Sequence, residues 1–383
     1  MSNPATAQTA PVSYPALDAR MQLAPDSSAR SVGGLVRYIR ASFTSDEERS
    51  GAAFAWVARH IRYAVPSEFS VEFDADPAEV VQRALSQRSG MSQEFAELYA
   101  ALANALGLKT HVVHGFTRLA NGRLSPLHHS WCVTRLGSQW YLMDPTHDAA
   151  QLGKFASVPP LGTTPFQSPP ADFVRTRFPF DPLWQLLEAP YSLPDFEKQK
   201  VPVTPARTFA FADSLAAYER LSPEGQLRAT RRRVQQQRMH HRLPELYLSA
   251  TERLEYNYVA ESHNRMLDSY NRAQQRTDRA VTQLNAFFDY YNHQFQPRKT
   301  DAQLQQLLPP IAADLQQARA ILTTVQFTDE ARQATVRQLA ESVSSGEARL
   351  RKSQAFLKRY LATPMAQRPV LFTTRSGPNE MTR

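Results

Sequence analysis

Residues 88–107 read RSGMSQEFAELYAALANALG and predict a buried helix that starts near Ser92. The apolar residues recur at steps of three and four, as one face of an α-helix requires: Phe95, Tyr99, Leu102 and Leu106. Gly107 follows, and glycine is common just beyond a helix C-terminus. The first backbone N–H groups of a helix have no partner within it, and the helix dipole is positive there. A nucleophile at position 92 would therefore lie where a thiolate or an oxyanion is stabilised.

Two strands and a tight turn are predicted after this helix. Residues 111–118, HVVHGFTR, are rich in β-branched and aromatic residues, which favour a strand. Residues 130–144, SWCVTRLGSQWYLMD, predict a hairpin whose two-residue turn lies at residues 137–138. The sequence therefore predicts antiparallel strands beside a buried helix.

The register of this hairpin brings two polar side chains together. Counting back from the turn sets Trp131 opposite Asp144 and places His129 diagonally from Asp144 on the same face. Cβ atoms at such positions lie roughly 7 Å apart or a little less, which a carboxylate–imidazole hydrogen bond can span. Cys132, the only cysteine, is three residues from His129 and points to the opposite face. We interpret Cys132 as a small buried apolar side chain and not as a nucleophile.

These motifs resemble the core of a transglutaminase-like domain of the papain-like cysteine protease superfamily, as found in bacterial proteins. Members commonly carry Gly-x-Cys-x-x-(Tyr/Phe)-Ala at a helix start, His-x-Trp on a strand and Trp-Tyr-x-x-Asp on its partner. The matching residues here are Gly90, Ser92, Phe95, Ala96, His129, Trp131, Trp140, Tyr141 and Asp144. The resemblance covers roughly residues 30–150. It implies an α+β fold with a helix packed on an antiparallel sheet and with Ser92, His129 and Asp144 at the triad positions. Gly90, Met91 and Trp131 are the implied residues of the substrate cleft.

The residue at the nucleophile position separates two hypotheses. Ser92 stands where the family has cysteine, Cys132 where asparagine is usual, and His147 where tryptophan often follows. A thiol with a pKa of about 8.5 ionises readily beside an imidazolium, whereas a serine hydroxyl stays neutral. In the first hypothesis Ser92 is an inert helix N-cap, and the protein is an inactive binding or scaffold module for a protein, peptide or cell-wall polymer. In the second, a Ser92-His129-Asp144 triad catalyses amide hydrolysis or acyl transfer.

The chain is longer than one such domain. Its 383 residues, 42% apolar and 21% charged, are ordinary for a soluble globular protein of two or three domains. No stretch approaches the ~18 uninterrupted apolar residues of a membrane span. We predict a flexible lead-in at residues 1–30, the transglutaminase-like domain at 31–157, a proline-rich irregular strap at 158–206, a helical bundle at 207–365 and a flexible tail at 366–383.

The predicted strap and the predicted bundle differ in character. The centre of the strap, residues 178–190 (FPFDPLWQLLEAP), combines aromatic residues with prolines that forbid a regular helix. We expect Trp184 to pack between domains, with a substrate groove as the alternative. Beyond residue 206, apolar residues repeat every seven positions and predict a long antiparallel helical bundle. Pro309 and Pro310 must kink or interrupt its second helix.

Charge and histidine content suggest few other functions. The formal net charge is +8, and a basic stretch contains Arg231, Arg232, Arg233, Arg238 and Arg242. Because no aromatic residues or recognised nucleic-acid module accompany it, we interpret it as a solvated helix face and do not expect nucleic acid as a partner. The histidines lack metal-site spacing, so no metal or cofactor is predicted. The lead-in lacks a signal peptide's apolar core, which leaves two alternatives for the compartment: an exported protein, periplasmic or secreted, if a signal peptide was removed, and otherwise a cytoplasmic one.

Overall fold

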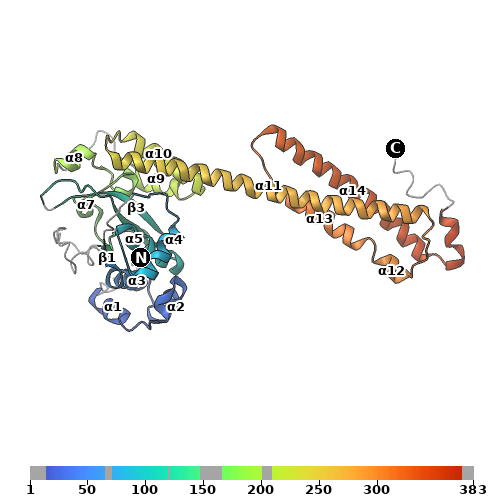
Figure 1. Cartoon of the computed structure of the whole chain (residues 1–383), viewed down its shortest axis with the longest axis horizontal. Coiled ribbons are helices and arrows are strands. Elements are labelled where there is room, and N and C mark those ends of the chain that lie inside the picture. Colours follow the sequence, from blue (N-terminus) through green and yellow to red (C-terminus); the bar gives the residue numbers. More distant parts are fainter. Residues whose placement is uncertain (1–13, 65–70, 120, 147–165, 201–208, 373–383) are drawn as a thin grey trace, which may run out of the picture. The chain divides into compact units, whose positions relative to one another are not determined.

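The computed structural model of the chain describes residues 14–64, 71–119, 121–146, 166–200 and 209–372 (Figure 1). The chain divides into two compact units, Met1–Tyr256 and Asn257–Arg383. The division falls within helix α11 (Arg242–Asn292), which begins in the first unit and ends in the second. No helix in the described ranges is both long and apolar enough to cross a membrane.

Helix α5 (Ser92–Leu106) is at the centre of the first unit, as the sequence predicts. Tyr99 and Leu102 are completely buried, and Gly107 ends the helix in the left-handed conformation with a φ of 95°. α3 (Asp46–His60) packs beside α5 in the same hydrophobic core. The other helices of this region are α1 (Tyr14–Met21), η1 (Ser28–Arg30), α2 (Val32–Ser42) and α4 (Pro77–Gln87).

Four strands form an antiparallel sheet in the order β5-β4-β3-β6. Their bounds are β3 (Thr110–Thr117), β4 (His129–Leu136), β5 (Gln139–Met143) and β6 (Arg177–Pro179). The predicted hairpin register is confirmed, because Leu136 pairs with Gln139 across a turn in which Gly137 has a φ of 58°. A separate parallel pair joins β1 (Arg62–Tyr63) to β2 (Ser89–Gly90), just before α5.

The two faces of the sheet are covered by different elements. Successive residues of a strand point to opposite faces. Cys132 therefore packs toward α5, while Trp131 packs toward η2 (Pro182–Gln185) and α9 (Phe211–Tyr218) on the other side. The hairpin that carries the candidate site is thus held between two apolar layers.

Helices α9 and α10 (Pro223–Gln236) belong to the first unit, although the sequence assigns them to the bundle. Leu215 of α9 and Val234 of α10 are both 2% exposed and pack in the clusters that include sheet residues. The apolar residues of these helices pack against the sheet. A seven-residue repeat predicts an apolar helix face, but it does not tell whether that face packs on a sheet or on other helices. Two short helices also belong to this unit, α7 (Pro170–Phe173) and α8 (Leu193–Glu197).

The centre of the predicted strap is partly regular. Strand β6 pairs antiparallel with β3, so the expectation of an irregular segment is wrong for Arg177–Pro179. β6 is the edge strand, where a proline's missing N–H need not cost a ladder hydrogen bond. Trp184 packs against His111 and Tyr218, with ring centroids 4.9 and 5.3 Å away. Its role in aromatic packing is confirmed, but within one unit.

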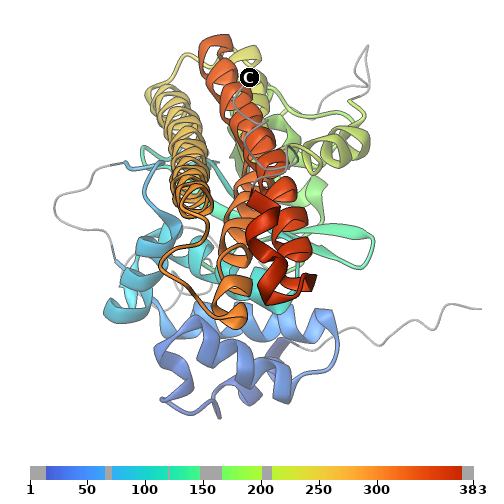
Figure 2. The same ribbon diagram turned by 90° about the vertical axis from the view of Figure 1, so that its right-hand side faces the viewer.

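The second unit is helical. Apolar residues of α11, α13 (Pro309–Leu322) and α14 (Glu330–Ala362) form one core, and the two views show these helices side by side (Figures 1 and 2). α12 (Asp301–Gln305) and η3 (Met365–Phe372) complete it. The prediction of a long helical region after the sheet domain is confirmed.

The conflict posed by Pro309 and Pro310 is resolved by a helix break. α12 ends at Gln305, and the two prolines open α13. At those positions the missing N–H has no intrahelical partner to lose. Close packing of α13 on α14 follows from Gly346, where an added Cβ would lie 3.0 Å from a methyl carbon of Leu315.

Candidate active site

Ser92 is the first residue of α5 and is 1% exposed. The N-cap is Met91, and the Ser92 hydroxyl oxygen accepts a hydrogen bond from the backbone N–H of Ser130, at 3.1 Å. The interpretation of Ser92 as the helix cap is therefore wrong. A cap side chain must stand one position earlier to reach the free N–H groups of the first turn. Instead, the hydroxyl joins α5 to β4 at the residue that follows His129.

His129 and Asp144 form the hydrogen bond that the hairpin register predicts. Nε2 of His129 lies 2.8 Å from Oδ2 of Asp144, which is completely buried. With Nε2 donating to the carboxylate, Nδ1 of the neutral imidazole carries a lone pair. Among the described residues, no hydrogen bond joins the Ser92 hydroxyl to this ring. His129 and Asp144 are thus in contact, whereas the Ser92 hydroxyl is hydrogen-bonded to a backbone amide.

Asp144 has a further partner that the sequence did not reveal. Nε of Arg177, in β6, lies 2.6 Å from the same Oδ2 atom, and the backbone N–H of Thr146 donates to Oδ1 at 3.1 Å. Arg177 is only 7% exposed. Arg177 lies 33 residues from Asp144 in the sequence, within a proline-rich segment. The sequence therefore did not predict this contact. The one available signal was a charged residue directly before the aromatic run that starts at Phe178.

The guanidinium changes what Asp144 can do for His129. In a serine triad the carboxylate stabilises the imidazolium that forms when histidine takes the nucleophile's proton. Here the carboxylate already neutralises the buried cation of Arg177. The positive charge of Arg177 offsets part of the negative charge of Asp144. Asp144 therefore stabilises an imidazolium at His129 less than an unpaired carboxylate would.

Two of the three predicted cleft residues are buried. Trp131 is completely buried, with its ring centroid 6.2 Å from His129 and 5.6 Å from Phe173. Met91 is 6% exposed. At Gly90 an added Cβ would lie 2.5 Å from Glu94, so this position has no room for a side chain. A role for these three residues in binding substrate stays a prediction.

Cys132 is confirmed as a buried apolar side chain. It is completely buried, and its Sγ donates to the carbonyl oxygen of Ala96 at 3.2 Å. Burial raises the pKa of this thiol well above its ordinary value, and the nearby carboxylate of Glu97 adds to the shift. A thiol held neutral in this way cannot replace the missing nucleophile.

Glu97 predicts a pH-dependent stability. Burial raises its pKa from 4.5 to about 7. Between those values the folded protein keeps a proton that the unfolded chain has released, so the free energy of unfolding falls as the pH rises to 7. Glu97→Gln should therefore stabilise the protein by about 3 kcal/mol at pH 8 and by little near pH 4.5, as measured by urea unfolding. Glu79→Gln, at an exposed position of α4, is the control; an equal gain at both pH values would contradict the prediction.

The basic stretch is partly paired within the first unit. Arg233 donates to both carboxylate oxygens of Asp181, at 2.8 and 2.7 Å, and Asp181 is 2% exposed. Arg231 lies 3.0 Å from Glu255 of α11. The interpretation as a solvated face is wrong for Arg233, because a long-range carboxylate neutralises it. Among the described residues, no three of the His, Cys, Asp and Glu side chains are grouped to hold a metal ion; His147 lies outside these residues.

The comparisons with known proteins agree with this architecture. Residues 33–145 match the family model of the Transglutaminase-like superfamily. Two curated proteins, both called Kyphoscoliosis peptidase, are similar to this chain. The mouse protein is 26% identical over 197 residues, which cover 47% of this chain and 29% of that protein. The human protein is 24% identical over 163 residues, covering 40% and 24%.

Two solved structures show low overall similarity. A candidate cysteine protease from Cytophaga hutchinsonii has 19% identity and a TM-score of 0.24, over 33% of this chain and 41% of that one. A TGase has 19% identity and a TM-score of 0.22, over 37% and 35%. The chain spans less than a third of the curated relatives. It contains a transglutaminase-like domain of α+β class followed by a long helical region.

Proposed function

We propose that this chain is a catalytically silent transglutaminase-like protein that acts as a binding or scaffold module for a protein, peptide or cell-wall polymer. The observation that carries the proposal is the burial and hydrogen bonding of Ser92. Ser92 is 1% exposed, and its hydroxyl accepts a hydrogen bond from the N–H of Ser130. The oxygen that would attack a substrate carbonyl is thus engaged by a backbone amide, a contact that a thiol sulfur, as a weak acceptor, makes poorly.

Two further features support the proposal that the site is catalytically inactive. A serine nucleophile requires a general base that takes its proton, and the Ser92 hydroxyl makes no hydrogen bond to His129 among the described residues. Arg177 also neutralises the carboxylate that would stabilise a protonated His129. Both features weaken the proton transfer on which a serine triad depends.

An active amide hydrolase or acyl transferase with a Ser92-His129-Asp144 triad is the second candidate. The 2.8 Å contact between His129 and Asp144 favours it, because this pair would orient a general base. The similar curated proteins are also called peptidases. Catalytic hydrogen bonds can tighten when substrate binds, so the missing Ser92–His129 bond alone does not exclude this candidate.

The test compares the wild type with Ser92→Ala and Ser92→Cys. We expect the wild type and Ser92→Ala to release no ammonia from glutamine peptides and to resist fluorophosphonate labelling. Ser92→Cys should gain about 100-fold or more over that background, because a thiol at a helix start can ionise beside His129. His129→Ala added to Ser92→Cys should remove the gain. Wild-type turnover that Ser92→Ala abolishes would contradict silence and support the triad.

A further inference from the structure

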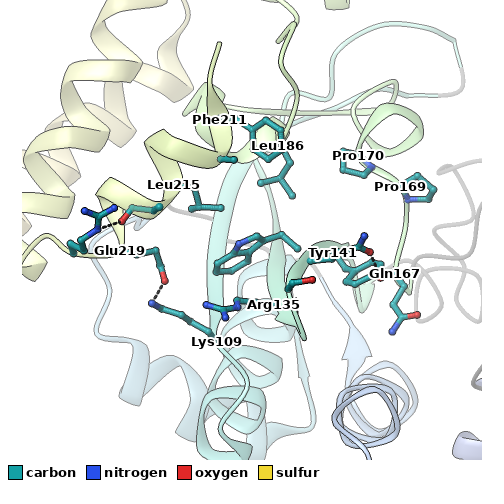
Figure 3. Close-up of a pocket in the computed structure, with 16 residues that line it drawn as sticks. Lys109, Arg135, Tyr141, Gln167, Pro169, Pro170, Leu186, Phe211, Leu215 and Glu219 are labelled. Atoms are coloured by element: carbon teal, nitrogen blue, oxygen red, sulfur yellow. Dashed lines mark hydrogen bonds and ion pairs between the residues drawn. The ribbon is translucent and has the colours of Figure 1, made fainter. Parts of the chain in front are cut away.

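The first unit has a cleft that is separate from Ser92, His129 and Asp144. Its volume is about 880 Å³, within the range of pockets that hold a small ligand or a short peptide. It lies at the turn end of the β4–β5 hairpin, whereas His129 begins β4 and Asp144 follows β5. α9 forms one wall and residues 167–170 form another (Figure 3).

The walls of this cleft differ in character. Phe211, Leu186 and Leu215 lie together on one side, and Lys109 and Arg135 lie on the opposite side (Figure 3). An apolar group and an anionic group of the same ligand would therefore find separate places in it. This arrangement suits an amphipathic anionic ligand better than a purely apolar one.

The cationic side of the cleft is not balanced by the protein. Lys109 pairs with Glu219, whose other oxygen lies 2.7 Å from His111. Nε of Arg135 donates to the carbonyl of Gly137, and Nε of Arg220 donates to that of Ala216. In the described chain, neither guanidinium has a carboxylate partner. Glu219 is thus paired with Lys109 and His111. The guanidinium groups of Arg135 and Arg220 remain to bind an anionic ligand.

The backbone of β5 offers a second kind of contact. β5 is the edge strand, and the N–H of Ser168 donates to the carbonyl of Leu142 at 3.1 Å. Because ladder hydrogen bonds alternate along an antiparallel strand, Trp140 turns its N–H and C=O away from β4, to the same side as Leu142. No described residue pairs with these groups of Trp140, which lines the cleft.

We propose that this cleft binds an acidic peptide in an extended conformation. Its backbone continues the sheet at Trp140, which is the usual way in which a peptide uses an exposed strand edge. An apolar side chain packs between Phe211 and Leu215, and carboxylates of the peptide bind Arg135 and Arg220. The net charge of +8 favours approach of such a partner.

The test uses the full chain and a fluorescein-labelled decapeptide that alternates glutamate and leucine. Ala216 is an exposed residue of α9 that lines the cleft, so Ala216→Trp fills the cleft without entering the core. We expect Ala216→Trp and Arg135→Gln each to weaken binding by about tenfold in fluorescence anisotropy. Added salt should weaken wild-type binding as well.

Matched controls come from positions outside the cleft. Ala217→Trp, also exposed on α9, and Arg123→Gln, an exposed arginine, should leave the affinity unchanged. The proposal is overturned if the wild type shows no saturable binding, if a glutamine-leucine peptide binds equally well, or if Ala217→Trp weakens binding as much as Ala216→Trp. Self-association that Ala216→Trp abolishes, seen by sedimentation without peptide binding, would also overturn it in favour of a second copy. These outcomes are independent of activity at Ser92.

Discussion

Asp144→Asn should lower the free energy of unfolding by about 3–5 kcal/mol, because it leaves the buried guanidinium of Arg177 without its counter-charge. Asp144 is completely buried and Arg177 is 7% exposed, with 2.6 Å between Nε and Oδ2. Asparagine keeps the shape, removes the charge and replaces one acceptor oxygen with an N–H donor. Urea unfolding measured by circular dichroism gives the change directly.

Two variants show whether the buried cation causes this loss. Arg177→Met in the Asp144→Asn background should recover much of it, since no charge then remains buried. Asp74→Asn breaks an ion pair with Arg253 whose side chains are 27% and 58% exposed, and should cost about 1 kcal/mol or less. If Asp144→Asn costs no more than Asp74→Asn, Arg177 does not depend on Asp144 in the way proposed.

Gly115→Ala should destabilise the protein by about 3 kcal/mol, a large effect for one methyl group. A Cβ at this position would lie 2.1 Å from the carbonyl oxygen of Phe178 and 2.7 Å from the Trp131 ring. The strain separates β6 from β3, so backbone amides of β6 should also exchange hydrogen faster. Thermal unfolding and hydrogen exchange measure the two effects.

Gly137→Asn is the matched control for this prediction. Gly137 has a φ of 58°, and an added Cβ there would meet nothing within 4 Å. Asparagine tolerates the left-handed conformation, so the cost should stay within about 1 kcal/mol. Equal losses for the two variants would mean that the close approach of β6 to β3 does not determine stability.

The parts of the site that the sequence predicted depend on local rules. A two-residue turn fixes the register of its own hairpin, and alternation then sets which side chains share a face. This is why the contact between His129 and Asp144 and the buried orientation of Cys132 could be predicted. Helix α5 was predicted for the same reason, from a periodic apolar face that ends at a glycine.

The features of the site that could not be predicted from the sequence are of two kinds. They depend on contacts between residues far apart in the chain, or on the exact residue at which a helix begins. Arg177 reaches Asp144 only because β6 adds to the sheet edge, and the prolines around β6 are typical of irregular chain. Arg233 meets Asp181 across 52 residues. A shift of one position at the start of α5 decided whether Ser92 caps the helix or contacts β4, and helix limits are rarely predicted that closely.

The burial of Cys132 gives the native protein a useful chemical property. The chain has one sulfhydryl group, and in the folded state it is completely enclosed and held protonated. A cysteine introduced at an exposed position would therefore be the single site for alkylation or dye attachment in the native protein. When the core opens, Cys132 itself becomes accessible, so the rate of its modification reports how often the sheet and α5 separate.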